Sequence, residues 1–387
     1  MSEVDERTLE LAEQAAGWLD AETLDDLERA LQDDPDAVIP DEPRTRAIVG
    51  ALHPFAGNPG DAARRAEREA LIAMARKTID ELRRRRGISS PARYLDRDGQ
   101  VGAALLALLV ARPAIAVAGG TFVAPRTKPW DVLDSSREVI ESVFPLVGRI
   151  EVPALPFPHY AGTGFVVGDG LILTNRHVVE FFARKAAAGR WVFQEGFTAH
   201  IDFGEERLPE GVSLPAAAQA RTTFAIEEIL GCHEDEAGEQ GMDLALLRVA
   251  RRASDGGGTL PEPVVLSPDG RGVPEGPPAF LVGYPGRQER NPEPGLMDGL
   301  FQRIYYVKQL QPGTVMHVIT DGAQKGILQH DCSTLPGNSG SCLVDLATGD
   351  VIGLHYAGVH GRFNLAVALW MLRDDPFLSR FEINWAA

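Results

Sequence analysis

The spacing of hydrophobic residues changes near residue 147. Before that point apolar residues recur every three or four positions, as they do over 9–19 and 24–31, which is the spacing of one face of a helix. After it, short runs rich in Val, Ile, Leu and Phe alternate with Gly, Pro and Asp, a pattern typical of strands joined by turns. The pattern therefore predicts an all-α N-terminal region followed by an all-β domain.

Three domains follow from this change. Residues 1–87 are predicted to form a helical interaction or regulatory domain, and residues 88–146 a helical connector. Residues 147–387 hold the β domain, which begins with a strand at 147–152. The helices are predicted over 9–19, 24–31, 44–52, 61–86, 94–110 and 130–143, with one short strand at 114–117.

Enough strands are predicted after residue 147 for two barrels. The segment 287–300 is rich in Gly, Pro and charge, so we predict a loop there. The predicted strands are 164–167, 171–174, 198–202, 223–230, 244–249 and 279–283, then 303–307, 315–320, 327–332, 341–344, 351–354 and 366–369.

Charge is divided unevenly along the N-terminal region. Residues 1–50 carry fifteen acidic and four basic side chains, whereas residues 51–90 carry five and nine. Two interpretations remain open. The region is either a solvated bundle whose charges complement its helix dipoles, or a module that binds an adaptor or further copies of itself.

The whole chain of 387 residues has a net charge of −17, which disfavours nucleic acid or an anionic membrane as a partner. The N-terminus lacks the pattern of a signal peptide, and the apolar run 101–111 is too short for a membrane span, so we expect a cytoplasmic protein. Cys332 and Cys342 could pair as a disulfide, but with Cys232 we favour free buried thiols in a reducing compartment. The nine histidines are dispersed, so no metal or cofactor is expected.

The most informative stretch is residues 333–342, which contains Gly337-Asn338-Ser339-Gly340. A serine in such a turn can present its hydroxyl beside the N–H groups of Gly337 and Ser339, and acyl transfer needs such a nucleophile and oxyanion hole. His177 ends a strand-turn-strand segment, and Asp243 opens an apolar strand. The order His177, Asp243, Ser339 is one of the known orders of a catalytic triad.

These motifs resemble the chymotrypsin-like serine proteases, in particular the bacterial branch that includes glutamyl endopeptidases. The resemblance covers residues 147–370. It implies an all-β double barrel in which His177 is the base, Asp243 orients it, Ser339 is the nucleophile, and Gly337 and Ser339 form the oxyanion hole. The supporting motifs are Thr174-Asn175-Arg176-His177-Val178, Asp243-Leu244-Ala245-Leu246, Gly283-Tyr284-Pro285-Gly286 and Gly337-Asn338-Ser339-Gly340-Ser341.

The resemblance also implies details of specificity and control. Asn338 stands where relatives activated by cleavage have an aspartate, so activation by trimming is not implied. Thr334 and His355 match positions that contact an acidic side chain in glutamyl endopeptidases, which suggests cleavage after Glu or Gln. His355 is alternatively a core residue of an apolar strand. The expected function is an intracellular serine endopeptidase acting on protein or peptide, in bacterial defence or signalling; the alternative is a protease-fold scaffold without turnover.

Overall fold

The computed structural model places most of the chain after residue 112. It describes residues 77–78, 113–124, 130, 132–187, 189–207, 222–234, 240–254, 256–270, 273, 278–287, 301, 303–320, 322, 325–359 and 363–386. The predicted helices over 9–19, 24–31, 44–52, 61–86 and 94–110, and the loop over 287–300, lie almost entirely outside these residues. They stay predictions, as does the division at residues 87 and 146.

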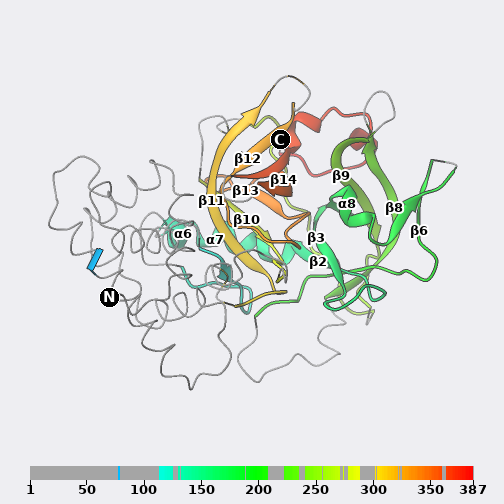
Figure 1. Ribbon diagram of the computed structural model, residues 1–387, viewed down its shortest axis with the longest axis horizontal. Helices are drawn as coiled ribbons and strands as arrows, with labels where there is room; N and C mark the ends of the chain where they lie inside the picture. Colours follow the sequence, from blue (N-terminus) through cyan, green and yellow to red (C-terminus); the bar gives the residue numbers. More distant parts are fainter. Residues whose placement is uncertain are drawn as a thin grey trace, which may run out of the picture. The chain divides into compact units, whose positions relative to one another are not determined.

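Two compact units are present. One consists of residues 1–114, 123–135 and 288–304, and its described part includes the short helix α6 (Val132–Ser135). The other consists of residues 115–122, 136–287 and 305–387. Every strand, and every residue of the site described below, belongs to this second unit (Figure 1).

The first barrel is closed and has the strand order β2-β3-β4-β9-β8-β7, with antiparallel neighbours throughout. Its interior is aliphatic and aromatic, with Val166, Phe182, Ile201 and Leu247 fully buried. Its strands are β2 (Val147–Glu151), β3 (Tyr160–Gly168), β4 (Leu171–Thr174), β7 (His200–Asp202), β8 (Thr223–Glu234) and β9 (Gln240–Val249).

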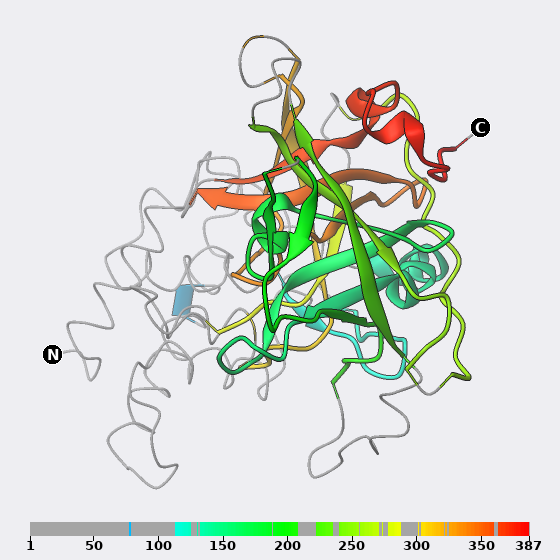
Figure 2. The same ribbon diagram turned by 90° about the vertical axis from the view of Figure 1, so that its right-hand side faces the viewer.

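The second barrel has the order β11-β10-β13-β14-β15-β12, and pairing between β11 and β12 closes it. The separate strand β1 (Ile115–Ala116) adds to the start of β11. Figures 1 and 2 show the first barrel in green and the second in yellow to red. Its strands are β10 (Pro278–Gly283), β11 (Gln309–Ile319), β12 (Ile327–His330), β13 (Cys342–Asp345), β14 (Val351–Val359) and β15 (Phe363–Ala368).

The predicted all-β double barrel is therefore confirmed. Short helices and one hairpin complete it: α7 (Arg137–Val143), α8 (Arg176–Val179), the 3-10 turns η2 (Phe144–Leu146), η5 (Leu369–Leu372) and η6 (Leu378–Arg380), and the strands β5 (Ala183–Lys185) and β6 (Trp191–Phe193). The β5–β6 hairpin was not among the predicted strands.

One predicted strand is wrong, and one predicted helix is interrupted. The strand over 303–307 does not form: Arg303 and Tyr306 have positive φ values of 56° and 65°, which a strand cannot include, and β11 begins only at Gln309. The helix over 130–143 is divided, because a turn at Ser136 separates α6 from α7.

Candidate active site

His177 and Asp243 meet at one edge of the first barrel. His177 lies in α8, directly after β4, and its Nδ1 is 2.6 Å from Asp243 Oδ2. The His177 backbone N–H also donates to Asp243 Oδ1 at 3.1 Å. Since a carboxylate only accepts, the proton on Nδ1 points at Asp243, and Nε2 is left as the acceptor.

Asn175, the residue before α8, holds the backbone of Asp243. Asn175 is fully buried, and its Nδ2 donates to the Asp243 carbonyl oxygen at 2.7 Å. The side chains of His177 and Asp243 are 38% and 22% exposed. The pair is therefore anchored in the barrel while the imidazole remains open to solvent and to a substrate.

Ser339 lies in a turn of the second barrel that is clamped against β3 of the first. The Thr163 backbone N–H donates to the Ser339 carbonyl at 2.8 Å, and Thr163 Oγ1 donates to the Gly337 carbonyl at 2.7 Å. Across the turn, the Gly340 N–H donates to the His355 carbonyl at 2.9 Å. The two bonds of Thr163 cross from barrel to barrel, and the Gly340 bond joins the turn to β14 within the second barrel. Together they set the position of the serine backbone.

Glycine is required at two positions of this turn. Gly337 and Gly340 have φ values of 98° and 89°, and a Cβ at either site would collide with neighbouring atoms. At Gly337 these atoms are the Tyr160 hydroxyl and the Tyr284 carbonyl; at Gly340 they include the Thr163 carbonyl. The tight approach explains the Gly-Asn-Ser-Gly sequence in physical terms.

The N–H groups of Gly337 and Ser339 have no acceptor among the residues described, whereas those of Asn338, Gly340 and Ser341 are all bonded to backbone carbonyls. Ser339 itself is half-buried. Two unpaired donors beside a serine can bind a developing oxyanion.

Asn338 is fully buried behind this turn. Its Oδ1 accepts a hydrogen bond from Gln311 Nε2 at 3.4 Å, so an amide faces an amide. The absence of activation by trimming stays a prediction.

His355 is buried in β14, with 3% of its surface exposed. Its Nδ1 lies 3.2 Å from Nε2 of His330, another fully buried histidine. Burial, reinforced by the nearby charge of His177, lowers the pKa of His355 to about 3. The ordinary pKa of histidine is about 6.5, so this environment favours the neutral imidazole of His355, which can donate or accept a hydrogen bond but carries no charge to attract a glutamate.

Thr334 already has a partner in the second barrel. Its Oγ1 donates to Asn364 Oδ1 at 2.7 Å, and Asn364 Nδ2 donates to the Cys332 carbonyl at 2.7 Å. Asn364 is the register partner of both His330 and Gly358. The sequence singled out neither Asn364 nor His330, and their only signal was a polar residue in a strand otherwise rich in apolar ones.

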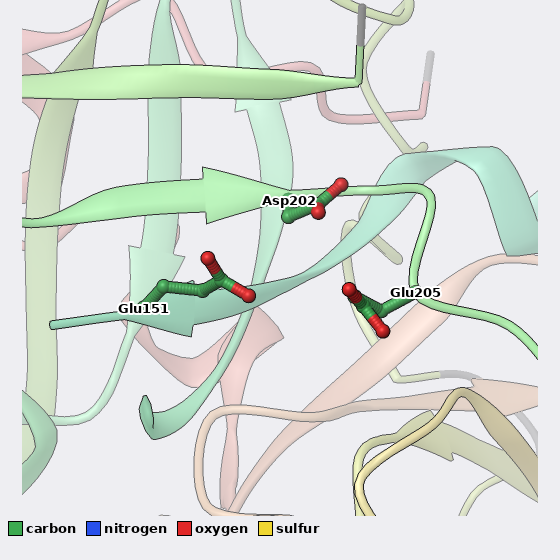
Figure 3. Close-up of side chains that lie close together, drawn as sticks. All are labelled: Glu151, Asp202 and Glu205. Atoms are coloured by element: carbon green, nitrogen blue, oxygen red, sulfur yellow. The ribbon is translucent and has the colours of Figure 1, made fainter. Parts of the chain in front are cut away.

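Three acidic side chains of the peptidase unit lie close together, and each has hydrogen-bond or ion-pair partners within the protein. Oxygen atoms of Glu151, Asp202 and Glu205 lie within 4.8 Å of one another (Figure 3). Arg149 is hydrogen-bonded to Glu151 and 3.4 Å from Glu205, and Asp202 Oδ1 accepts hydrogen bonds from Gly204 N–H and Thr222 Oγ1. These contacts account for the group, and we place no metal there.

The three cysteines are free and buried. Burial raises the pKa of the Cys232 thiol to about 12, and it does the same for Cys342. Neither sulfur is suited to act as a nucleophile near neutral pH.

Residues 162–354 match the family model of the trypsin-like peptidase domain, and this range includes His177, Asp243 and Ser339. The chain contains a trypsin-like peptidase domain. Its sequence is similar to glutamyl endopeptidases of Staphylococcus epidermidis, among them the one from strain ATCC 12228 / FDA PCI 1200, with 25% identity over 229 residues. The match covers 58% of this chain and 62% of each relative.

Solved structures that resemble the peptidase domain include the active form of the Rv3671c protease from M. tuberculosis, with 18% identity and a TM-score of 0.38 over 61% of this chain and 81% of that chain. The inactive form of the same protease has 17% identity and a TM-score of 0.37 over 61% and 89%. Among the described residues of the peptidase chain, no helix is long and apolar enough to cross a membrane.

Proposed function

We propose that this peptidase domain is a serine endopeptidase with the triad His177, Asp243 and Ser339. Ser339 Oγ attacks the carbonyl carbon of a peptide bond while His177 Nε2 takes the hydroxyl proton. The imidazolium then returns that proton to the leaving amine, and an acyl-serine remains for water to hydrolyse. Asp243 keeps the Nδ1 proton in place, so that Nε2 is always the basic atom.

The observation that carries this proposal is the 2.6 Å contact between His177 Nδ1 and Asp243 Oδ2. Many histidines contact carboxylates in proteins without catalytic purpose, but this pair accompanies two unpaired N–H groups beside a serine. The N–H groups of Gly337 and Ser339 would hold the oxyanion of the tetrahedral intermediate, a contribution of about 10²–10³ in rate for each donor.

Hydrolysis of a protein substrate tests the proposal. Wild-type protein should release peptides from casein, and Ser339→Ala should lower the rate by about 10⁴-fold or more. Ser254→Ala is the matched control, because Ser254 is an exposed serine whose Oγ bonds only the Thr223 carbonyl. Absence of turnover in the wild type, together with equal binding of a protein partner by the wild type and by Ser339→Ala, would instead favour a scaffold.

We further propose that the primary pocket accepts a Gln side chain, and Glu less well. Thr334, His355 and Asn364 would line it, and a neutral His355 suits a carboxamide, which both donates and accepts. Burying a carboxylate without a cation is costly. Peptide libraries should show Gln before the cleaved bond, with a ratio of Gln to Glu cleavage that stays constant between about pH 5.5 and 8, since neutral His355 does not titrate there. A ratio that changes steeply near the ordinary histidine pKa would contradict this specificity.

Residues 1–87 are proposed to recruit an adaptor or regulate the enzyme, and the protein is proposed to act in the cytoplasm. The divided charge of residues 1–90 supports the first proposal, and the three free thiols agree with the second. Removing residues 1–87 should leave turnover of a short peptide intact. Loss of turnover in a truncated protein that remains folded would show instead that this region is part of the enzyme.

A further inference from the structure

A second histidine–aspartate pair, His233 and Asp375, contacts the backbone of Met242, the residue that precedes Asp243. His233 is near the end of β8 and is buried, with 7% of its surface exposed. Its Nδ1 accepts a hydrogen bond from the Met242 backbone N–H at 2.9 Å, and its Nε2 lies 3.1 Å from Asp375 Oδ2. Because Nδ1 is an acceptor here, the ring proton resides on Nε2 and is donated to Asp375.

The backbone around Asp243 needs such support, because the ladder between β8 and β9 is irregular there. Cys232 pairs with Ala245, and the next pair is Glu234 with Gln240. Between these two pairs β9 has residues 241–244, opposite the single residue His233 of β8. Extra residues of this kind interrupt the regular exchange of backbone hydrogen bonds. The ring of His233 supplies an acceptor to the Met242 N–H inside this bulge.

Asp375 comes from the C-terminal segment, which both ribbon views draw in red beside the ends of β8 and β9 (Figures 1 and 2). Its Oδ1 accepts from the N–H groups of Phe377 and Leu378 at 2.8 and 3.2 Å, at the start of η6. The remaining oxygen faces His233. The Asp375 carboxylate is thus held by the backbone at the start of η6, and its other oxygen orients the His233 imidazole.

We propose that His233 and Asp375 are positioning residues for Asp243. Asn175 holds the Asp243 carbonyl, and the Asp375–His233 pair holds the N–H of the residue before it, so the bulge that carries the carboxylate is fixed from both sides. A carboxylate of the C-terminal segment thus supports the strand that carries Asp243. This inference rests on the proposed function, since it assigns what aligns Asp243 with His177 for that reaction.

The test uses His233→Leu, which removes both hydrogen bonds at similar bulk. A catalytic group displaced by about 1 Å can cost up to about 10²-fold in rate, so we expect kcat for a peptide substrate to fall by about 10- to 100-fold with KM little changed. His233→Asn keeps an acceptor near the position of Nδ1 and should recover much of the loss. His317→Leu is the matched control, because His317 is an exposed histidine of β11.

A second measurement is independent of turnover. In the Ser339→Ala protein, the hydrogen-bonded His177 Nδ1 proton should give a low-field ¹H signal, identified by its loss on adding Asp243→Asn. His233→Leu should shift this signal clearly upfield or remove it, and His317→Leu should leave it in place. A merely structural role for His233 would lower the melting temperature without moving the signal.

The outcomes separate the two proposals. Wild-type kcat and an unmoved signal in folded His233→Leu would overturn the positioning role, while Asp243→Asn continued to abolish turnover. If Asp243→Asn itself left turnover unchanged, the proposed function would fail instead. Should His233→Leu fail to fold, Asp375→Asn takes its place: it retains one oxygen for the η6 turn but presents an amide donor to the His233 Nε2–H, and the same two criteria apply.

Discussion

His177 of the first barrel and His355 of the second differ in what surrounds them. His177 of the first barrel is 38% exposed and contacts a carboxylate. His355 of the second barrel is 3% exposed, and its partner is a second buried histidine, His330. A carboxylate can stabilise an imidazolium, whereas another imidazole in a dry environment cannot.

This difference indicates opposite roles for the same side chain. An open imidazole that is oriented by an acceptor can take and return a proton. A buried imidazole that stays neutral can only donate or accept a hydrogen bond, and it can do so without changing charge. His177 is therefore suited to proton transfer, whereas His355 is suited only to hydrogen bonding in its neutral form.

The largest effect is expected when the carboxylate acceptor of His177 is removed. Asp243→Asn should lower kcat by about 10⁴-fold without unfolding the protein, because an amide can donate to His177 and so stabilise the wrong tautomer. Rates of peptide hydrolysis and circular dichroism together measure this. The control is Asp169→Asn, since Asp169 is an exposed carboxylate in a surface ion pair with Arg251.

A smaller effect is expected where the two barrels meet. Thr163→Val keeps the shape of a fully buried side chain but removes the bond from Oγ1 to the Gly337 carbonyl and the bond that Oγ1 accepts from the Tyr284 N–H. The unpaired carbonyl should cost about 1–3 kcal/mol in the free energy of unfolding, and the loosened turn should lower kcat by about tenfold. Thr259→Val, at an exposed threonine, should change neither quantity; equal effects from both variants would rule out a special role for Thr163.

The last effect is on stability alone and concerns the buried histidine and pH. The pKa of His355 is lowered to about 3 in the folded chain, against about 6.5 in the unfolded chain. Between these values the unfolded chain binds a proton that the folded chain excludes. The free energy of unfolding should therefore fall as pH drops below about 6.5, by about 1.4 kcal/mol per pH unit from this residue. The pKa of His330 is lowered as well and adds to the slope.

Urea unfolding between pH 7 and 5 measures that slope. His355→Gln removes the titrating group, so its unfolding free energy should fall less steeply than that of the wild type. His317→Gln, at an exposed site of β11, should retain the wild-type slope. Identical slopes for His355→Gln and the wild type would contradict a neutral buried His355.

The strands of the double barrel could be predicted because each one carries its own signal. The run over 171–174 is short, apolar and bounded by turn residues, and β4 occupies Leu171–Thr174. The expected strand over 303–307 has the same kind of composition, since Ile, Tyr and Val dominate it. There the backbone takes positive φ at two residues, and neighbours distant in sequence rather than local preference decide such a conformation.

Prediction of the site from the sequence is limited in the same way to residues that carry a local signal. His177, Asp243 and Ser339 could be singled out because each lies in a short motif, and the structure brings the first two into contact. Asn364, His233 and Asp375 lie in no motif. Their importance depends on which strand or turn lies opposite, and the pairing of Thr334 with Asn364 joins residues thirty positions apart. Sequence spacing cannot reveal contacts of that kind.

Ser339 is proposed to be a nucleophile that His177 activates. Labelling with a fluorophosphonate probe, followed by mass-spectrometric mapping of the adduct, measures the reactivity of this serine. We predict a single adduct on Ser339 Oγ in the wild type, abolished in Ser339→Ala and strongly slowed in His177→Ala. An adduct on another residue, or labelling of Ser339 at the same rate without His177, would contradict the account.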